Sequence, residues 1–173
     1  KGLSRFIEHS LPIILKAEPE SGLVVVGDNP DQSLNKMGEQ REILQVVDRL
    51  NLSGAMKFLG QVNDMDLLAC YASADVQILP LIDVPGDVEG FGMVAIEAAA
   101  CGTPTVAFSV GGVADAVCPD NGRLIEKGKY DLFANAVIEN LSQRKPDRVQ
   151  CINHAKKYAW SHFHYKIKIL LSS

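Results

Sequence analysis

A doubly wound α/β fold, with a Rossmann-like parallel sheet between two layers of helices, is predicted by three features of the sequence. Short β-branched runs alternate with stretches of helical periodicity along the whole chain. These runs are continuously apolar, as is typical of parallel strands that are covered on both faces. The length of 173 residues fits one domain that can bury its own core. We therefore treat residues 1–173 as a single domain.

The elements follow in chain order from the periodicity. The first helix is indicated by Leu3, Phe6, Ile7 and Ile14, which share one helical face. The expected strands are Leu23–Val26, Met56–Leu59, Val76–Leu79, Thr105–Phe108 and Arg123–Ile125. The expected helices are Leu3–Ala17, Gln40–Leu50, Met65–Ala72, Gly92–Cys101, Val113–Val117, Tyr130–Leu141, Arg148–Tyr158 and His162–Leu171. The last two, within residues 148–173, are C-terminal helices of the domain.

Composition and charge argue against several classes of protein. A net charge of −4 and a pI near 5.5 disfavour a nucleic-acid partner, since nucleic-acid binders usually carry a basic face. The four cysteines form no C-x-x-C pair, so no zinc or redox motif is expected. His9 and His154 lie in helical stretches near charges, and we interpret both as surface residues. No apolar run approaches the roughly 20 residues that a membrane span needs.

The loops after the strands form the predicted ligand edge, because ligands of such folds bind outside the carboxyl ends of the strands. Gly27 follows the first strand and Gly60 the second, and glycine permits close approach of the backbone. After the third strand comes an irregular segment, Leu81–Glu89, and then Gly90-Phe91-Gly92 at the start of a helix. The first amides of that helix have no intrahelical partner, and with the helix dipole they favour a phosphate.

Two acids flank this helix start. Glu89 stands directly before the glycines, where a carboxylate would repel a phosphate, so it is better suited to hydroxyl groups. Glu97 lies more than one turn into the helix and can accept hydrogen bonds from a diol, as an acid does on a ribose. The pair therefore suits a ligand that is part diphosphate and part polyol. The alternative for both residues is that they are ordinary solvated acids.

Residues 89–97, EGFGMVAIE, resemble the E-x7-E signature of the retaining glycosyltransferases of family 4, which have the GT-B fold. Further segments resemble the family in its usual order: KGLSRFIEHSLPIILKAEP, LVVVGDNP, KFLGQV, LLACYASADVQILP, AIEAAACGTPTVAFSVGGVADAV, NGRLIEKG and the final YAW. Together they cover almost the whole chain. The resemblance is to the C-terminal, donor-binding domain, so we expect a fragment from which the N-terminal acceptor domain is absent.

The resemblance implies roles for the residues around the helix start. Glu97 would hold the ribose hydroxyls of a nucleoside diphosphate sugar. Glu89 and the backbone of Gly90–Gly92 would face the donor sugar, with Glu89 orienting it rather than attacking as a nucleophile. The amides of Met93 and Val94 would bind the phosphates.

Two further positions follow from the same resemblance. Lys1 matches the family's diphosphate-binding lysine in its KG element. The nucleobase would rest against residues 60–64, where Asp64 can accept hydrogen bonds from guanine; uracil offers one such donor. Capping of the helix that begins at Met65 is the alternative for Asp64, and the general frequency of Asp caps favours it.

The implied reaction is transfer of a glycosyl group, with retention, from a GDP- or UDP-linked sugar to a glycan or lipid-linked acceptor. No metal is expected, because helix amides and basic side chains stabilise the departing diphosphate. The isolated fragment is expected to be inactive. A cytoplasmic location, at the inner face of the membrane, fits lipid-linked acceptors. Lys156, Lys157, Lys166 and Lys168 could touch an acidic membrane surface, although a solvated face is the default.

Two other functions compete with this one. Residues 90–95 satisfy G-x-G-x-x-G/A with Asp115 about twenty residues on, a pattern of NAD(P)-binding oxidoreductases. That fingerprint should follow its strand directly, whereas here an irregular segment intervenes. A non-catalytic sugar-nucleotide binding module is the other alternative, and the intact E-x7-E element argues against it. A metal site of Asp83, Asp87 and Glu89 is disfavoured because Pro85-Gly86 interrupts the ligand spacing.

Overall fold

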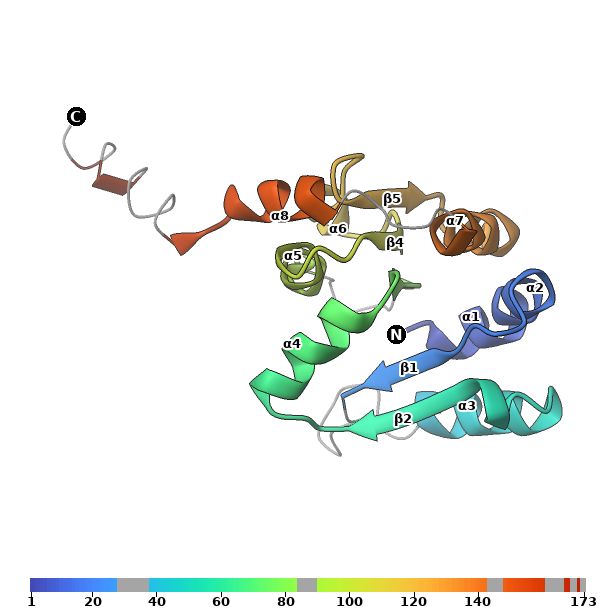
Figure 1. Ribbon diagram of the computed structural model, residues 1–173. Coiled ribbons are helices and arrows are strands. Elements are labelled where there is room, and N and C mark those ends of the chain that lie inside the picture. Colours follow the sequence, from blue (N-terminus) through green and yellow to red (C-terminus); the bar gives the residue numbers. More distant parts are fainter. Residues whose placement is uncertain (28–37, 84–89, 143–147, 161–166, 169–170, 172–173) are drawn as a thin grey trace.

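The structure is a computed structural model that describes residues 1–27, 38–83, 90–142, 148–160, 167–168 and 171 (Figure 1). Its strands are β1 (Leu23–Val26), β2 (Met56–Gly60), β3 (Gln77–Leu79), β4 (Thr105–Phe108) and β5 (Gly122–Ile125). Its helices are α1 (Leu3–His9), α2 (Leu11–Ala17), α3 (Gly38–Arg49), the 3-10 turn η1 (Ser53–Ala55), α4 (Asp64–Ser73), α5 (Met93–Ala100), α6 (Val113–Ala116), α7 (Tyr130–Ser142) and α8 (Arg148–Lys156). The alternating order of a Rossmann-like α/β fold is thereby confirmed.

The described strands pair in parallel, but in two sheets and not in one. β1 pairs with β2, and β3, β4 and β5 form a second sheet in that order. Strand β4 lies in the middle of its sheet and is buried along its whole length, as a covered parallel strand should be. Strands β1 and β2 are only partly covered, so the expectation of burial on both faces is wrong for them.

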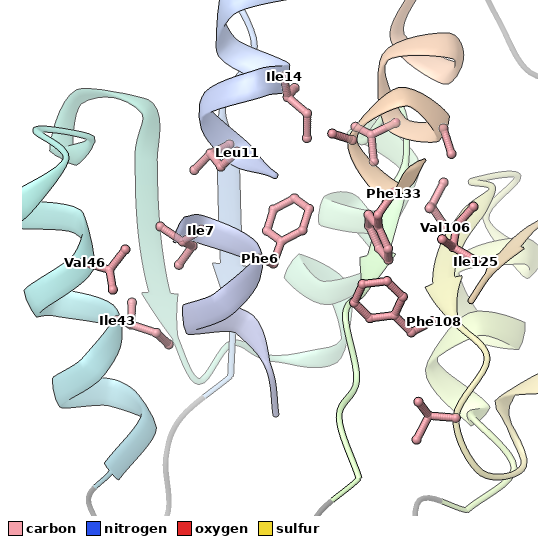
Figure 2. Packing of buried hydrophobic residues seen from close by; sticks show 14 of the residues in the cluster. Phe6, Ile7, Leu11, Ile14, Ile43, Val46, Val106, Phe108, Ile125 and Phe133 are labelled. Atoms are coloured by element: carbon pink, nitrogen blue, oxygen red, sulfur yellow. The ribbon is translucent and has the colours of Figure 1, made fainter. Parts of the chain in front are cut away.

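Side chains of α1 join the two sheets. The Phe6 ring meets the Phe133 ring edge-on with centroids 5.4 Å apart, and Phe133 in turn packs on Phe108 of β4 at 4.8 Å. Figure 2 shows Ile7, on the other side of the same helix, facing the side of α3 that carries Ile43 and Val46. Among the described residues, the β1–β2 half and the β3–β5 half of the domain are thus held together by apolar packing. In the part of the chain that the structure describes, no backbone hydrogen bonds pair β1 with β3.

The first expected helix, Leu3–Ala17, is interrupted at Ser10. Pro12 has no amide to donate to Glu8, so the helical ladder breaks and a new helix, α2, begins at Leu11. The buried Ser10 hydroxyl donates to the carbonyl of Tyr130 at 2.9 Å, which ties the break to the start of α7. Helix α2 contacts α7, and α1 contacts α3 (Figure 1).

A second core cluster lies under α5, α6 and α8. Small side chains of α5, including Ala95 and Ala99, let α8 pack closely through Cys151 and Ala155. At the start of α8, Arg148 donates to the carbonyls of Ala72 at 2.9 Å and Ala74 at 3.3 Å. These bonds satisfy carbonyl groups at the end of α4, a helix that has no buried side chain of its own.

The other expected elements agree with the structure to within a few residues at their ends. Most of the expected helix His162–Leu171 lies outside the described residues. No helix in the described part of the chain is both long enough and apolar enough to cross a membrane.

Candidate functional site

The carboxyl ends of the first three strands bring several predicted residues to one edge. Gly27 donates from its amide to the carbonyl of Gly60 at 2.8 Å, which fastens the ends of β1 and β2 together. Both residues have positive φ, 115° and 65°, and a Cβ on either would meet none of the described residues within 4 Å. Beyond β3, Gly2 lies so close to the carbonyl of Pro80 that a Cβ would stand 2.1 Å from its oxygen. This contact brings Lys1 to the same edge.

Glycines also bring the loop after β4 against the Gly90–Gly92 turn. A Cβ on Gly112 would lie 2.6 Å from the carbonyl oxygen of Gly90, so only glycine fits without a shift of the backbone. Gly92 has a φ of 77° and packs on Val113, the first residue of α6. The turn is therefore shaped by its neighbours, and a substitution at Gly112 would displace it.

The start of α5 is held by a side chain of β3, which a residue of β4 fixes in turn. The side-chain amide of Gln77 on β3 donates to the carbonyl of Val94 at 3.2 Å, and its oxygen accepts from the buried Thr105 hydroxyl of β4 at 2.8 Å. Met93 and Val94 are exposed, with 57% and 40% of their surface accessible. Helix geometry leaves the first amides of α5 without intrahelical acceptors, so this end can bind an anion.

Glu97 projects from α5 toward α4. Its Oε2 accepts from the Tyr71 hydroxyl at 3.2 Å, although the residue itself is exposed. Burial raises the pKa of the Tyr71 hydroxyl well above its usual range, and the adjacent Glu97 carboxylate raises it further. The same two causes, burial first, raise the pKa of the Cys101 thiol. Tyr71 thus remains a hydrogen-bond donor to the carboxylate, a partner that the sequence did not reveal.

Asp64 does not cap α4, contrary to the favoured sequence interpretation. The cap is Asn63, whose Oδ1 accepts from the amide of Asp66 at 2.9 Å, while Asp64 is the first helical residue. The cap of α4 lies one residue earlier than predicted because Asn caps a helix as well as Asp does. Asp64 is exposed, and its position after Gly60 leaves it at the open edge beyond β2.

Of the remaining residues that the sequence analysis singled out, the structure describes some and not others. Phe91 packs on Tyr158 with ring centroids 5.3 Å apart. Glu89 and Asp87 lie outside the described residues, and Asp83 makes an exposed ion pair with Lys127 at 2.5 Å. A hollow of about 540 Å³ between α1 and α3, lined by groups such as Arg5, Glu8 and Glu42, contains none of the predicted site residues. The candidate site, as far as the described residues show it, is therefore separate from this hollow.

One cluster was missed by the sequence interpretation. His154 is 5% exposed, so its assignment to the surface is wrong, whereas the His9 side chain is half exposed. The His154 ring faces Cys118 and Asp120 in the turn before β5. Because α8 and this turn are distant in sequence, a search for closely spaced ligands could not detect the grouping.

Comparison with known proteins identifies a family. The family of "Glycosyl transferases group 1" matches residues 1–158. A GDP-mannose-dependent monoacylated alpha-(1-6)-phosphatidylinositol monomannoside mannosyltransferase of Corynebacterium glutamicum is 31% identical over 144 residues, which are 82% of this chain and 35% of that protein. The chain thus spans about a third of the length of this curated relative.

Solved structures share the fold. HepE of Anabaena in complex with UDP superimposes with a TM-score of 0.70 at 27% identity, over 95% of this chain and 45% of that one. The C-terminal domain of a glycosyl transferase group 1 family protein from Francisella tularensis has a TM-score of 0.64 at 25% identity, over 90% of this chain and 74% of that one.

Proposed function

The chain belongs to the group 1 family of glycosyl transferases, and on that premise we propose that it is the C-terminal, donor-binding domain of a retaining enzyme. The family supplies the reaction class, a sugar-nucleotide-dependent glycosyl transfer. The C-terminal position is supported by the likeness to an isolated C-terminal domain, of which this chain covers 74%. Residues 1–173 then form the donor domain, and the acceptor belongs to an N-terminal domain.

The observation that carries the proposal is the fixed start of α5 at the glycine-lined edge. The diphosphate of the donor would accept hydrogen bonds from the amides of Met93 and Val94, and the turn of Gly90, Phe91 and Gly92 would let it approach. Gln77 holds this helix end in place before any ligand arrives. Negative charge on the departing diphosphate increases during transfer, so donors aimed at it lower the barrier more than they tighten binding of the substrate.

Glu97 would bind the ribose hydroxyls of the donor. Tyr71 donates to one carboxylate oxygen and thereby orients the group, which reduces the freedom lost when the diol binds. Lys1, brought to the edge by the Gly2–Pro80 contact, would pair with the diphosphate. Glu89 would orient the donor sugar. No metal is needed in this scheme, since amides and a lysine neutralise the leaving group.

The nucleobase would lie at the open edge near Gly27, Gly60 and Asp64. Absence of a capping role leaves the Asp64 carboxylate available to accept from a base. Related proteins differ in the base that they use: the Corynebacterium relative is named for GDP-mannose, and HepE was solved with UDP. We propose guanine, because its ring N–H and amino group together match a carboxylate.

The proposed acceptor is a glycan or a lipid-linked sugar, held by the N-terminal domain. We propose that the transfer takes place in the cytoplasm, at the inner face of the membrane. Lys156 and Lys157 on and after α8 are exposed basic residues that support contact with an acidic membrane surface.

A thermal-shift panel with GDP, UDP, ADP and NAD tests the donor site. Ligand that binds the folded chain at about 100 times its Kd should stabilise it by roughly 2.7 kcal/mol. We expect a shift with GDP that decreases in Glu97→Ala. The matched control is Glu20→Ala, since Glu20 is an exposed glutamate remote from α5 in sequence and should leave the shift unchanged.

The other outcomes are equally informative. A shift with UDP in place of GDP would support the site and reject guanine, and Asp64→Asn should then weaken binding only slightly, because uracil offers one donor to Asp64. A shift with NAD alone would support the oxidoreductase alternative and contradict the proposal. Product analysis by NMR with the complete enzyme tests retention, because the anomeric configuration of donor and product must then be the same.

A further inference from the structure

Three potential metal ligands meet where α8 lies against the turn before β5. Cys118 and Asp120 lie in the turn between α6 and β5, and His154 lies on α8. Their ligand atoms are all within 4.8 Å of one another, and the Cys118 Sγ stands 3.3 Å from the His154 Nδ1. Among the described residues, these three side chains form the group whose ligand atoms lie close enough together to bind one metal ion.

The turn that carries two of these residues is held rigidly. Asn121 is buried, accepts from the Cys118 amide at 2.8 Å and donates to the Ala116 carbonyl at 3.0 Å. These two bonds fix the backbone on either side of the cysteine. The Cys118 side chain is half-buried, so the thiol is positioned and still accessible to an ion from solvent.

His154 is the least satisfied member of the cluster. Its side chain is buried, with 5% of the residue exposed, and its Nε2 has no hydrogen-bond partner among the described residues. Its Nδ1 faces only a thiol, which is a weak hydrogen-bond partner. An ion bound at Nδ1 would replace this weak thiol contact with a stronger partner, whereas Nε2, on another edge of the ring, is not satisfied by it.

The donor set and spacing suit zinc. Sulfur, imidazole nitrogen and carboxylate oxygen are the ligands that Zn²⁺ takes in proteins, in a tetrahedral arrangement. Bonds of about 2.3 Å to sulfur and about 2.0 Å to nitrogen at a tetrahedral angle place those atoms roughly 3.5 Å apart. The observed 3.3 Å between Sγ and Nδ1 is close to that value, so these two ligands need little movement.

Asp120 would complete the set by a rotation of its side chain. Its carboxylate is 44% exposed and now accepts from Lys157 at 3.3 Å and from Gln150 at 3.4 Å. Both contacts are long, and an exposed pair of this kind contributes little stability. Zinc can therefore displace them, with Lys157 acting as a weak competitor for the same oxygen atoms.

We propose that Cys118, Asp120 and His154 form a zinc site that fastens α8 to the turn before β5. On binding, the Cys118 thiol releases its proton to solvent and a thiolate–zinc bond forms; water takes the fourth position. This site is separate from the candidate donor site and does not take part in the transfer reaction.

The zinc site would reach the candidate donor edge through packed rings. The His154 ring packs on Tyr158 with centroids 5.4 Å apart, and Tyr158 packs on Phe91 at 5.3 Å. The Tyr158 hydroxyl also donates to the carbonyl of Asp115 at 3.1 Å. Fixing His154 would thus restrict the residues behind the Gly90–Gly92 turn, as a positioning effect.

Metal binding by itself tests the proposal. The chain, stripped of metal, is titrated with Zn²⁺ against a chromophoric chelator, and with Co²⁺ to detect sulfur-to-metal charge-transfer absorption. We expect one ion per chain with a thiolate band. Cys118→Ser should lose the band and weaken zinc binding by more than about 100-fold, since even loss of an outer-shell partner costs about 10–100-fold.

Matched variants separate a site from general loss of folding. Cys101→Ser replaces another half-buried cysteine and should bind zinc as the unchanged chain does. Asp120→Asn alters a partly exposed side chain, should remain folded by circular dichroism, and should bind zinc more weakly. Lys157→Gln removes the competitor and should tighten binding. Absence of stoichiometric uptake, or equal uptake by Cys118→Ser, would overturn the proposal whether or not the donor site binds nucleotide.

Discussion

The two sheets of this domain differ in how fully they are buried. Val106 at the centre of β4 has no accessible surface, whereas Val24 on β1 is 53% exposed. The β3–β5 sheet is covered by α7 and by the α5–α8 pair, and it carries the start of α5. The β1–β2 sheet carries Gly27 and Gly60 at its open edge. The proposed phosphate site thus rests on the firmly packed half, and the proposed base site on the loosely packed half.

The largest effect on stability is expected from Phe6→Ala, which removes a contact between the two sheets. Removal of a fully buried ring from the helix that joins the halves should lower the free energy of unfolding by about 3–5 kcal/mol. Urea denaturation followed by circular dichroism and fluorescence measures it. Leu132→Ala, which trims a side chain that is 54% exposed on α7, should cost about 0.5 kcal/mol or less. Equal losses in the two variants would mean that Phe6 does not join the sheets.

A matched pair of valines compares the sheets directly. Val106→Ala should cost about 2 kcal/mol, because it removes buried methyl groups and leaves a cavity in β4. The same change at the exposed Val24 should cost about 0.5 kcal/mol or less. Urea midpoints at constant slope provide both values. A larger loss at Val24 than at Val106 would reverse the comparison.

The sequence predicted the order of the helices and strands. It did not predict how deeply each strand is buried by the helices around it. Periodicity located β1 and β4 to the residue, because parallel strands are short apolar runs in any context. It could not distinguish the buried β4 from the exposed β1, since burial depends on which helices pack nearby. The break at Ser10 was foreseeable from Pro12. The roles of Tyr71 and His154 were not, because their partners are distant in sequence.

A smaller and more local effect is expected at the turn beneath α5. Gly112→Ala places a methyl group against the Gly90 carbonyl and should cost about 1–3 kcal/mol. It should also weaken GDP binding in the thermal-shift panel, because the turn moves. Gly54→Ala adds the same methyl group in open space and should change neither quantity. Unaltered nucleotide binding in Gly112→Ala would separate this turn from the site.

The smallest effect appears only at alkaline pH. Burial, and then the Glu97 carboxylate, hold the pKa of Tyr71 above its ordinary value, so above about pH 10 the unfolded chain loses a proton that the folded chain keeps. Stability from this group is complete below pH 10 and decreases as pH rises. Urea midpoints between pH 8 and 11 should fall less steeply in Tyr71→Phe, with Glu97→Gln between the two. Parallel profiles would contradict the Tyr71–Glu97 pairing.

The bonds from Arg148 to the end of α4 have a mechanical consequence. Helix α4 has no buried side chain and is fastened near its last turn, so any tilt of the helix would pivot about Ala72 and Ala74. Asp64 stands at the other end, about 15 Å away for ten residues at 1.5 Å each. A tilt of about 10° at the pivot would swing Asp64 by roughly 2–3 Å, the difference between a hydrogen bond and none. A shift of Arg148 on α8 would therefore change the reach of Asp64 toward a base, although α8 itself touches no nucleotide in the proposed site.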